Sequence, residues 1–342
     1  MWYNIKRTRP HTGFAMPKKE SSLIEFQKRY ATEGGCIETL ARIRWPGGYA
    51  CARCGHKGAY RLRSRPRVFQ CVECGHQESV TAGTIFHRTR TSLVKWFWMA
   101  YLIGRDKRGV SALFLSRELA LRYETAWLMA HKIRHALTEG GGLLGGLVEV
   151  DETYYGGRGP SESRGRSISS HNKELIVMAV ERVRADEKEG AGIKGSGYVA
   201  GDLRIKVLPS ADSKTIGRFV RSQIKPGSRL FTDGFRSYLA LNDGYDHLPT
   251  IAGRGKQAVG VLPIVHTLFG NFKAWLNGTF HGVKSKHLPR YIREWSYRTN
   301  RRKNIPNILD YILKRAVMNP TITLDQLING KLVEGPIPAL TG

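Results

Sequence analysis

The stretch Leu147-Val148-Glu149-Val150-Asp151-Glu152-Thr153-Tyr154 decides the fold of the larger part of this chain. Its alternation of apolar, β-branched and acidic residues predicts a short, buried β-strand that carries carboxylates. Asp151 lies in the middle of this strand, directly after Val150. It is therefore the first candidate for a functional side chain.

Strands and helices alternate along the chain after this strand. We expect further strands at 175–183, 202–208 and 228–232, a helix from Asp212 to Ile224, and helices at 264–276 and 287–301. Three strands, a helix, a fourth strand and more helices is the order of a layered α/β domain that resembles RNase H. The pattern predicts an RNase H-like catalytic domain over residues 147–303.

Two aspartates of this domain are expected to meet at one edge of the sheet. Asp151 lies on the first strand and Asp233 directly follows the fourth, and in this strand order the two strands are central neighbours. Alone, either residue could be a helix cap or a turn residue. As a pair they are candidates for binding Mg²⁺, because neighbouring buried carboxylates repel each other unless they share a cation.

Four of the five cysteines lie within one short segment, as two C-x-x-C pairs formed by Cys51, Cys54, Cys71 and Cys74. In a reducing cytosol two such pairs are typical of a closed structural zinc site with four thiolate ligands. The alternative, a redox pair, would need one C-x-x-C in a βαβ unit. We therefore expect a zinc ribbon with one structural Zn²⁺.

The charge of the chain indicates a polyanionic partner. Its 342 residues include 55 Lys and Arg against 28 Asp and Glu, a formal net charge of +27. Nucleic acid is the leading partner, and an acidic membrane surface is the weaker alternative. No window approaches the roughly 18–20 uninterrupted apolar residues of a membrane span. We expect no membrane association and a cytoplasmic protein.

Three helices are expected between the ribbon and the α/β domain: one capped by Ser92, one at 110–119 and one at 123–137. The last two indicate a helix-turn-helix. The alternative is a packed three-helix bundle without a DNA contact. In this half of the chain the candidate DNA-binding residues are Arg61, Arg63, Arg65, Arg67, Arg122, Lys132 and Arg134.

These patterns divide the chain into six regions. They are a basic N-terminus (1–20), a helical support with the zinc ribbon (21–90), the helix-turn-helix region (91–138), a Gly-rich linker (139–146), the catalytic domain (147–303), and a C-terminal helix and tail (304–342).

Several motifs resemble the ISXO2-like (IS1595 family) bacterial transposases, which are DDE-type insertion-sequence transposases with an N-terminal zinc ribbon. These motifs are Asp151-Glu152-Thr153-Tyr154-Tyr155-Gly156-Gly157, Thr232-Asp233-Gly234-Phe235, residues 266–283, Lys286-His287-Leu288-Pro289-Arg290-Tyr291 with Glu294 and residues 298–302, and the ribbon from Arg44 onwards. The resemblance covers residues 20–303.

The resemblance implies an enzyme that binds the terminal inverted repeats of an insertion sequence, cleaves at the element ends and joins the 3′ ends to target DNA. It implies two-metal phosphoryl transfer with two Mg²⁺, or Mn²⁺, per active site. The expected partner is double-stranded DNA, and a homodimer or higher oligomer is expected on paired ends. The protein is then expected to be associated with the bacterial nucleoid.

Asp151, Asp233 and Asn271 match the triad positions of the family, with Asn where most DDE enzymes have Glu. Glu294 competes for the third position, because it is the only acidic residue between 252 and 303. It could instead pair with Arg290 or Arg298, four residues away on its helix. Other candidate catalytic or DNA-contacting residues are Lys273 and His281, and further DNA-binding candidates are Lys284, Lys286, Arg301 and Arg302.

Two other functions are compatible with parts of this pattern. A structure-selective RNase H-like nuclease would share the metal site but would not join strands. A domesticated DNA-binding regulator would keep the ribbon and helices and lose carboxylates, and the intact Asp151 and Asp233 argue against it.

Overall fold

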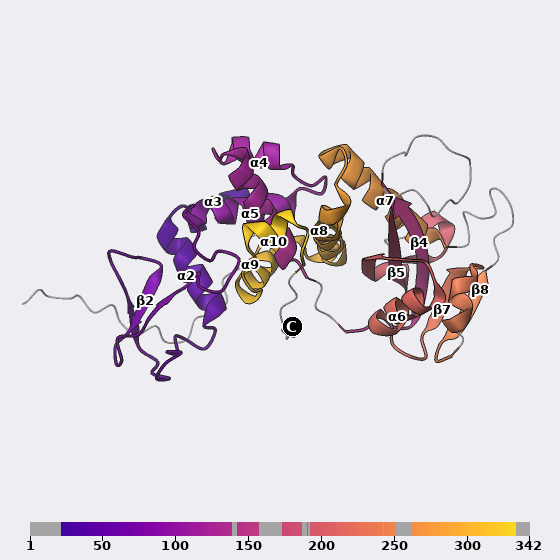
Figure 1. Ribbon diagram of the computed structural model, residues 1–342, viewed down its shortest axis with the longest axis horizontal. Coiled ribbons are helices and arrows are strands. Elements are labelled where there is room, and N and C mark those ends of the chain that lie inside the picture. The colour runs from indigo at the N-terminus through magenta and orange to yellow at the C-terminus, as the bar shows by residue number, and fades with distance from the viewer. Residues whose placement is uncertain are drawn as a thin grey trace, which may run out of the picture. The chain divides into compact units, whose positions relative to one another are not determined.

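The computed structural model describes residues 22–138, 142–156, 173–186, 190, 192–241, 243–250 and 262–332 (Figure 1). The expectations for residues 1–20 and for the end of the tail lie outside these ranges. The chain forms two compact units: unit 1 comprises Met1–Thr138 and Asn304–Pro338, and unit 2 comprises Glu139–Lys303 and Ala339–Gly342. Among the described helices, none combines the length and the apolar character needed to cross a bilayer.

Unit 1 combines a small antiparallel sheet with helices. The sheet has the order β1 (Ala59–Arg61), β2 (Val68–Cys71), β3 (Gln77–Ser79). The helices are α1 (Leu23–Arg29), α2 (Glu33–Arg44), α3 (Leu93–Arg105), α4 (Ala112–Glu118), α5 (Tyr123–Ala136), α9 (Ile308–Met318) and α10 (Leu324–Ile328). A 3₁₀ turn at Arg302–Asn307 spans the point in the chain where unit 2 ends and unit 1 resumes. The predicted cap at Ser92 is confirmed, since its side chain accepts a hydrogen bond from the backbone of Lys95.

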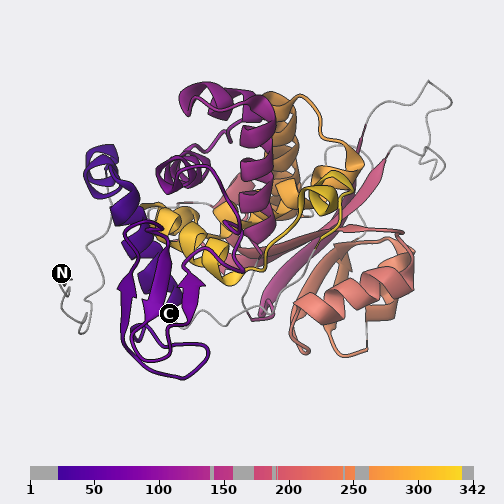
Figure 2. The same ribbon diagram turned by 60° about the vertical axis from the view of Figure 1, so that its left-hand side comes forward.

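The C-terminal helix α9 is part of the core of unit 1. It packs against α2, α3 and α5, and Figure 2 shows it in yellow beside the N-terminal helices. Gly104 of α3 permits this close packing, because a Cβ at that position would lie 3.0 Å from side-chain carbons of both Ile308 and Ile312. Residues more than 200 positions apart therefore share one core.

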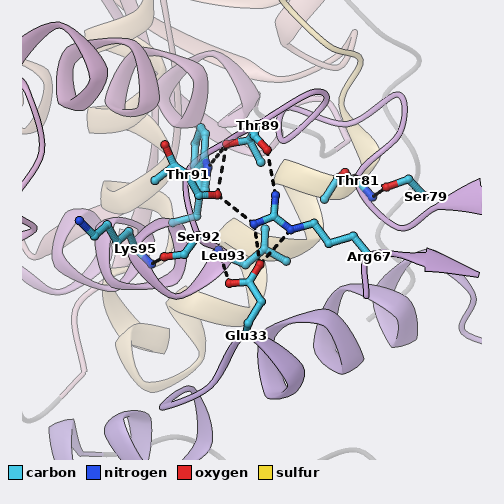
Figure 3. Close-up of polar contacts among 10 residues, drawn as sticks. Glu33, Arg67, Ser79, Thr81, Thr89, Thr91, Ser92, Leu93 and Lys95 are labelled. Atoms are coloured by element: carbon cyan, nitrogen blue, oxygen red, sulfur yellow. Dashed lines mark hydrogen bonds and ion pairs between the residues drawn. The ribbon is translucent and has the colours of Figure 1, made fainter. Parts of the chain in front are cut away.

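Arg67 joins three parts of unit 1 (Figure 3). Its guanidinium donates to Glu33 Oε1 at 2.5 and 2.9 Å, and to the carbonyls of Thr89 and Thr91 at 2.9 and 3.1 Å. Glu33 Oε2 also accepts from the backbone N–H of Leu93, at the start of α3. This corrects the expectation that Arg67 contacts DNA, because its donors are used to hold the sheet, α2 and α3 together.

Unit 2 is a mixed α/β domain around a five-stranded sheet. Its elements are β4 (Leu147–Tyr155), β5 (Glu174–Arg184), β6 (Tyr198–Leu208), α6 (Ser213–Gln223), β7 (Arg229–Asp233), β8 (Asp246–Thr250), α7 (Pro263–Phe280) and α8 (Leu288–Asn300), with 3₁₀ turns at Ile193–Gly195, Arg236–Leu241 and Ser285–His287. The sheet order is β6-β5-β4-β7-β8. β4, β5 and β6 are antiparallel, whereas β7 and β8 run parallel to β4.

The expected order of strands and helices is confirmed, including the cap of α6 by Asp212. Strand β8 was not predicted from the sequence. One face of the sheet forms a core with α6, to which β4 contributes Val148 and Val150. The opposite face forms a second core with α7 and α8. Alternation along β4 therefore directs Glu149, Asp151 and Thr153 toward α7.

Glu149 fixes the start of α7 to the sheet. Its carboxylate is fully buried and accepts from the backbone N–H groups of Ile264 and Val265 at 3.1 and 2.8 Å, and from Arg182 Nε at 2.8 Å. These two N–H groups lie in the first turn of α7, where no intrahelical acceptor exists and where negative charge is favoured. Burial raises the pKa of Glu149, and the donors around it oppose that rise.

We predict that Arg67→Ala lowers the free energy of unfolding of the zinc-loaded protein by about 2 kcal/mol. Glu33 and the carbonyls of Thr89 and Thr91 lose the hydrogen bonds that the Arg67 guanidinium donates to them. Chemical denaturation is the measurement. The control is Arg63→Ala, an exposed residue near the same turn, for which we expect a change within about 0.5 kcal/mol. Equal effects of the two substitutions would contradict a structural role of Arg67.

We also predict that Glu149→Ala destabilises unit 2 by about 3 kcal/mol, because it leaves Arg182 and the first turn of α7 without their acceptor. Glu149→Gln should cost less, since the amide oxygen can still accept from the helix. Thermal unfolding checks both variants, with Glu174→Ala on β5 as the control. A Glu149→Ala protein as stable as this control would show that α7 does not depend on Glu149.

Candidate active site and zinc site

Three carboxylates converge at one edge of the sheet of unit 2. Asp151 and Glu152 lie on β4, and Asp233 is the last residue of the parallel neighbour β7. One oxygen from each side chain lies within 4.8 Å of those of the other two. The predicted meeting of Asp151 and Asp233 is therefore confirmed, and Glu152 joins them.

Hydrogen bonds position two of these carboxylates. Asp233 Oδ1 accepts from the backbone N–H of Phe235 at 3.0 Å. Glu152 Oε2 accepts from the hydroxyl of Tyr238 at 2.6 Å. Burial, and then the nearby carboxylates, raise the pKa of Tyr238 well above its ordinary value, so it stays a donor.

Helix α7 places two basic side chains beside the end of β4. His266 Nε2 lies 3.1 Å from Asp151 Oδ2, and this hydrogen bond raises the pKa of His266. Lys273, two helical turns later, donates from Nζ to Thr153 Oγ1 at 2.6 Å. Burial lowers the pKa of Lys273, while the charge of Asp151 opposes that shift.

The three carboxylates fit a divalent cation. Acidic groups so close together repel one another, and oxygen ligands of this kind suit Mg²⁺ or Mn²⁺. His266 and Lys273 supply nearby positive or hydrogen-bonding groups, and Asp151 is only 8% exposed, so the repulsion is weakly screened by solvent. The arrangement can hold a metal ion and leave one side open to a phosphate.

Asn271 and Glu294, the two candidates for a third ligand, lie on α7 and α8. Asn271 is exposed, and lies five residues after His266, which is about 140° around the helix. Glu294 is fully buried on α8 and accepts from Arg298 Nη1 at 3.3 Å. The pairing of Glu294 with an arginine four residues away is thus confirmed.

The other candidates near α7 and α8 have different surroundings. His281 is exposed and ends α7 with a left-handed φ of 52°. Lys284 and Lys286 are exposed in the following turn. Arg301 stacks on the ring of Tyr297 at 3.7 Å, and Arg302 donates to the carbonyls of Thr299 and Ala200. Of these five candidates, only His281, Lys284 and Lys286 are therefore exposed.

The four cysteines of the ribbon form a closed cluster. Cys51 Sγ and Cys74 Sγ are 3.6 Å apart, as are Cys54 Sγ and Cys71 Sγ, and all four sulfurs lie within 4.8 Å of one another. Sulfurs bound to one tetrahedral Zn²⁺ at about 2.3 Å would be separated by about 3.8 Å. The geometry therefore fits one zinc ion.

Two tight turns give the cluster its shape. Gly55 and Gly75 follow the second cysteine of each pair with φ of 73° and 68°, which suits glycine. Their N–H groups donate to the carbonyls of Cys51 and Cys71 at 2.9 and 3.2 Å. Each C-x-x-C pair is therefore held by its own backbone, and the zinc ribbon predicted from the spacing is confirmed as a cysteine cluster.

The predicted basic surface of unit 1 is only partly available. Arg61, Arg63, Arg65 and Arg122 are exposed, and Lys132 is half-buried, with a pKa lowered by burial. Arg134 corrects the expectation: it is almost fully buried in α5 and donates to the carbonyl of Val110 at 3.2 Å. Its position on α5 directs it into the core, so it contributes to packing.

Three residues of the active site were not identified as site residues from the sequence: Glu152, Tyr238 and His266. Glu152 follows Asp151 directly, but alternation along a strand suggests that neighbours point apart. Here the strand end lets both carboxylates reach Asp233. The spacing of His266 and Lys273, seven residues on one helix, was a usable signal, because such residues share a face.

Comparison with known proteins gives three matches. Residues 143–300 match the ISXO2-like transposase domain, and residues 31–77 match the transposase zinc-ribbon domain. A relative from Halobacterium salinarum, described as an uncharacterized protein in transposable element ISH50, is 26% identical over 285 residues, which cover 79% of this chain and 92% of the relative. The chain therefore has a region similar to the transposase zinc-ribbon domain and a region similar to the ISXO2-like transposase domain.

Proposed function

We propose that the protein is a DNA transposase that binds the terminal inverted repeats of an insertion sequence, cleaves at the element ends and joins the 3′ ends to target DNA. The convergence of Asp151, Glu152 and Asp233 within the matched transposase domain carries this proposal. The family match supports a transposase, and the carboxylates supply the chemistry that DNA cleavage requires.

The sheet topology supports an RNase H-like catalytic domain. Numbered within unit 2, the strand order is 3-2-1-4-5, with the first three strands antiparallel and the last two parallel to the first. This connectivity puts the ends of strands 1 and 4 side by side. A site at that edge is what an enzyme of this fold needs in order to reach a DNA phosphate.

Two divalent ions, Mg²⁺ or Mn²⁺, would supply stabilisation of the attacking and leaving oxygens during phosphoryl transfer. Asp151 and Asp233 would hold them, and Tyr238 keeps Glu152 oriented toward the same place. Lys273 lies beside Thr153 at the open side, where its ammonium can contact a DNA phosphate. His281, Lys284 and Lys286 extend a basic surface from the end of α7.

Recognition of the element ends is assigned to unit 1. Exposed Arg61, Arg63 and Arg65 lie on the ribbon, and exposed Arg122 precedes α5, in the pair of helices α4 and α5 that we propose as a helix-turn-helix. These side chains can neutralise phosphates, so binding should weaken steeply with salt. Joining two ends requires both to be held together, so we propose a homodimer or higher oligomer on paired ends, acting at the nucleoid in the cytoplasm.

We predict that purified protein contains about one zinc per chain, and that Cys54→Ser together with Cys74→Ser removes it. Because a ribbon with such short strands lacks a large apolar core, its loss of metal should also abolish binding to terminal-repeat DNA. Metal analysis and a DNA-binding assay are the measurements, and Cys36→Ser, a buried residue outside the cluster, is the control. Retention of zinc by the double variant would contradict the site.

We also predict that Asp151→Asn and Asp233→Asn each lower cleavage and strand transfer by at least about 10³-fold while binding to terminal-repeat DNA stays within about twofold, since unit 1 supplies recognition. The assay combines paired element ends, Mg²⁺ and a target plasmid. Lys206→Ala, on the edge strand β6, is the control. Cleavage without joining by the wild type would support a nuclease instead.

A further inference from the structure

We propose that His266 supplies the third metal-binding side chain of the active site, where Asn271 was expected, and that its imidazole makes the site favour Mn²⁺ over Mg²⁺. The inference rests on the proposed function, since it concerns the metal site of the same reaction. His266 is the first residue of one of the matched motifs, residues 266–283, but was not assigned a role there.

The position of His266 on α7 is the first argument. The buried stripe of this helix includes Leu268, Phe272 and Trp275. His266 and Lys273 lie along one border of that stripe, next to β4, as their contacts with Asp151 and Thr153 show. Asn271 lies along the other border, about 140° from His266, so the same helix cannot turn both side chains toward Asp151.

The separation of the two candidate ligand atoms is the second argument. Neighbouring ligands of an octahedral ion, each at about 2.1 Å from the metal, lie about 3.0 Å apart. His266 Nε2 and Asp151 Oδ2 are 3.1 Å apart. One ion can therefore bind both atoms with little movement of either side chain, provided that the imidazole is neutral with its single proton on Nδ1, so that Nε2 is free to bind; a protonated ring would first release its Nε2 proton to solvent.

The exposure of His266 and the hydrogen bond that holds the backbone beside it are the third argument. The side chain of His266 is 36% exposed, so it faces the open side of the site, where an ion and a phosphate can enter. The backbone that carries it is held only one residue earlier, where Val265 N–H binds the buried Glu149. Glu149 and Asp151 lie on the same face of β4, so one strand fixes the helix and provides its metal partner.

The nature of the donor determines which metal is favoured. Imidazole nitrogen binds transition metal ions well, whereas Mg²⁺ takes oxygen ligands almost exclusively. A site of carboxylates with one imidazole should therefore bind Mn²⁺ more tightly than an all-oxygen site would, with little gain for Mg²⁺. This selectivity separates a ligand role from a purely structural hydrogen bond.

The test is metal binding by the full-length, zinc-loaded protein, measured by electron paramagnetic resonance for Mn²⁺ and by competition for Mg²⁺. We expect His266→Ala to weaken Mn²⁺ binding by at least about tenfold and to change Mg²⁺ binding by less than about threefold. His266→Glu should restore binding and shift the preference toward Mg²⁺. Asn271→Ala, on the same helix, is the matched variant and should leave both affinities unchanged.

Four outcomes distinguish the possibilities, with zinc content and thermal unfolding reporting that each variant is folded. Wild-type Mn²⁺ affinity in His266→Ala overturns this inference, and loss of affinity in Asn271→Ala assigns the third position to Asn271. Equal loss of both ions in His266→Ala also overturns it, because that result indicates only a positioning role. If Asp151→Asn binds Mn²⁺ like the wild type, the carboxylates are not the metal site, and the proposed function itself fails.

Discussion

The hydrogen bonds between the buried carboxylate of Glu149 and the first turn of α7 are the contact on which the active site depends. A strand at the centre of the sheet alternates its side chains between two faces, so Glu149, Asp151 and Thr153 all turn toward α7. Glu149 fixes the helix, and the next two positions then meet His266 and Lys273. One strand therefore sets the position of both halves of the site. The cost of burying Glu149 is offset by Arg182 and by the helix N–H groups, which would otherwise lack acceptors.

The carboxylates at the end of β4 and β7 are held in an arrangement that opposes folding in the absence of a cation. Asp151, Glu152 and Asp233 approach within 4.8 Å, and bonds from Tyr238 and from the backbone of Phe235 orient two of them. Like charges at this separation repel, especially where burial limits screening by water. A bound divalent ion would offset this repulsion, and its binding would then stabilise the strand ends. The same reasoning explains why basic side chains border the acidic cluster on the α7 side.

Much of this architecture follows from residue patterns that depend on local chemistry. The caps at Ser92 and Asp212, the strand that carries Asp151 and the cysteine pairs could all be predicted, because each relies on a few neighbouring residues. Strand β8 could not, since its sequence Asp246-His247-Leu248-Pro249-Thr250 is short, polar and contains a proline, and only the edge position beside β7 makes it a strand. Arg67 and Arg134 could not be separated from their exposed neighbours either. Whether an arginine faces solvent or a carboxylate partner depends on tertiary packing, which composition does not reveal.

The third position of the site shows where a sequence motif and a structure give different kinds of information. A motif identifies which residue types recur at a spacing, and Asn271 is plausible by that measure because an amide oxygen can bind a metal. The helix imposes a further condition: a ligand must leave α7 on the side that faces β4, and only residues near the angular position of His266 and Lys273 do so. Asn271 fails this condition, and Glu294 fails a different one, since it is fully buried and paired with Arg298 on α8. Among the candidates for the third ligand, the fold therefore favours His266, whose Nε2 lies 3.1 Å from Asp151 Oδ2. A nitrogen ligand in turn changes which metal ion the site binds more tightly.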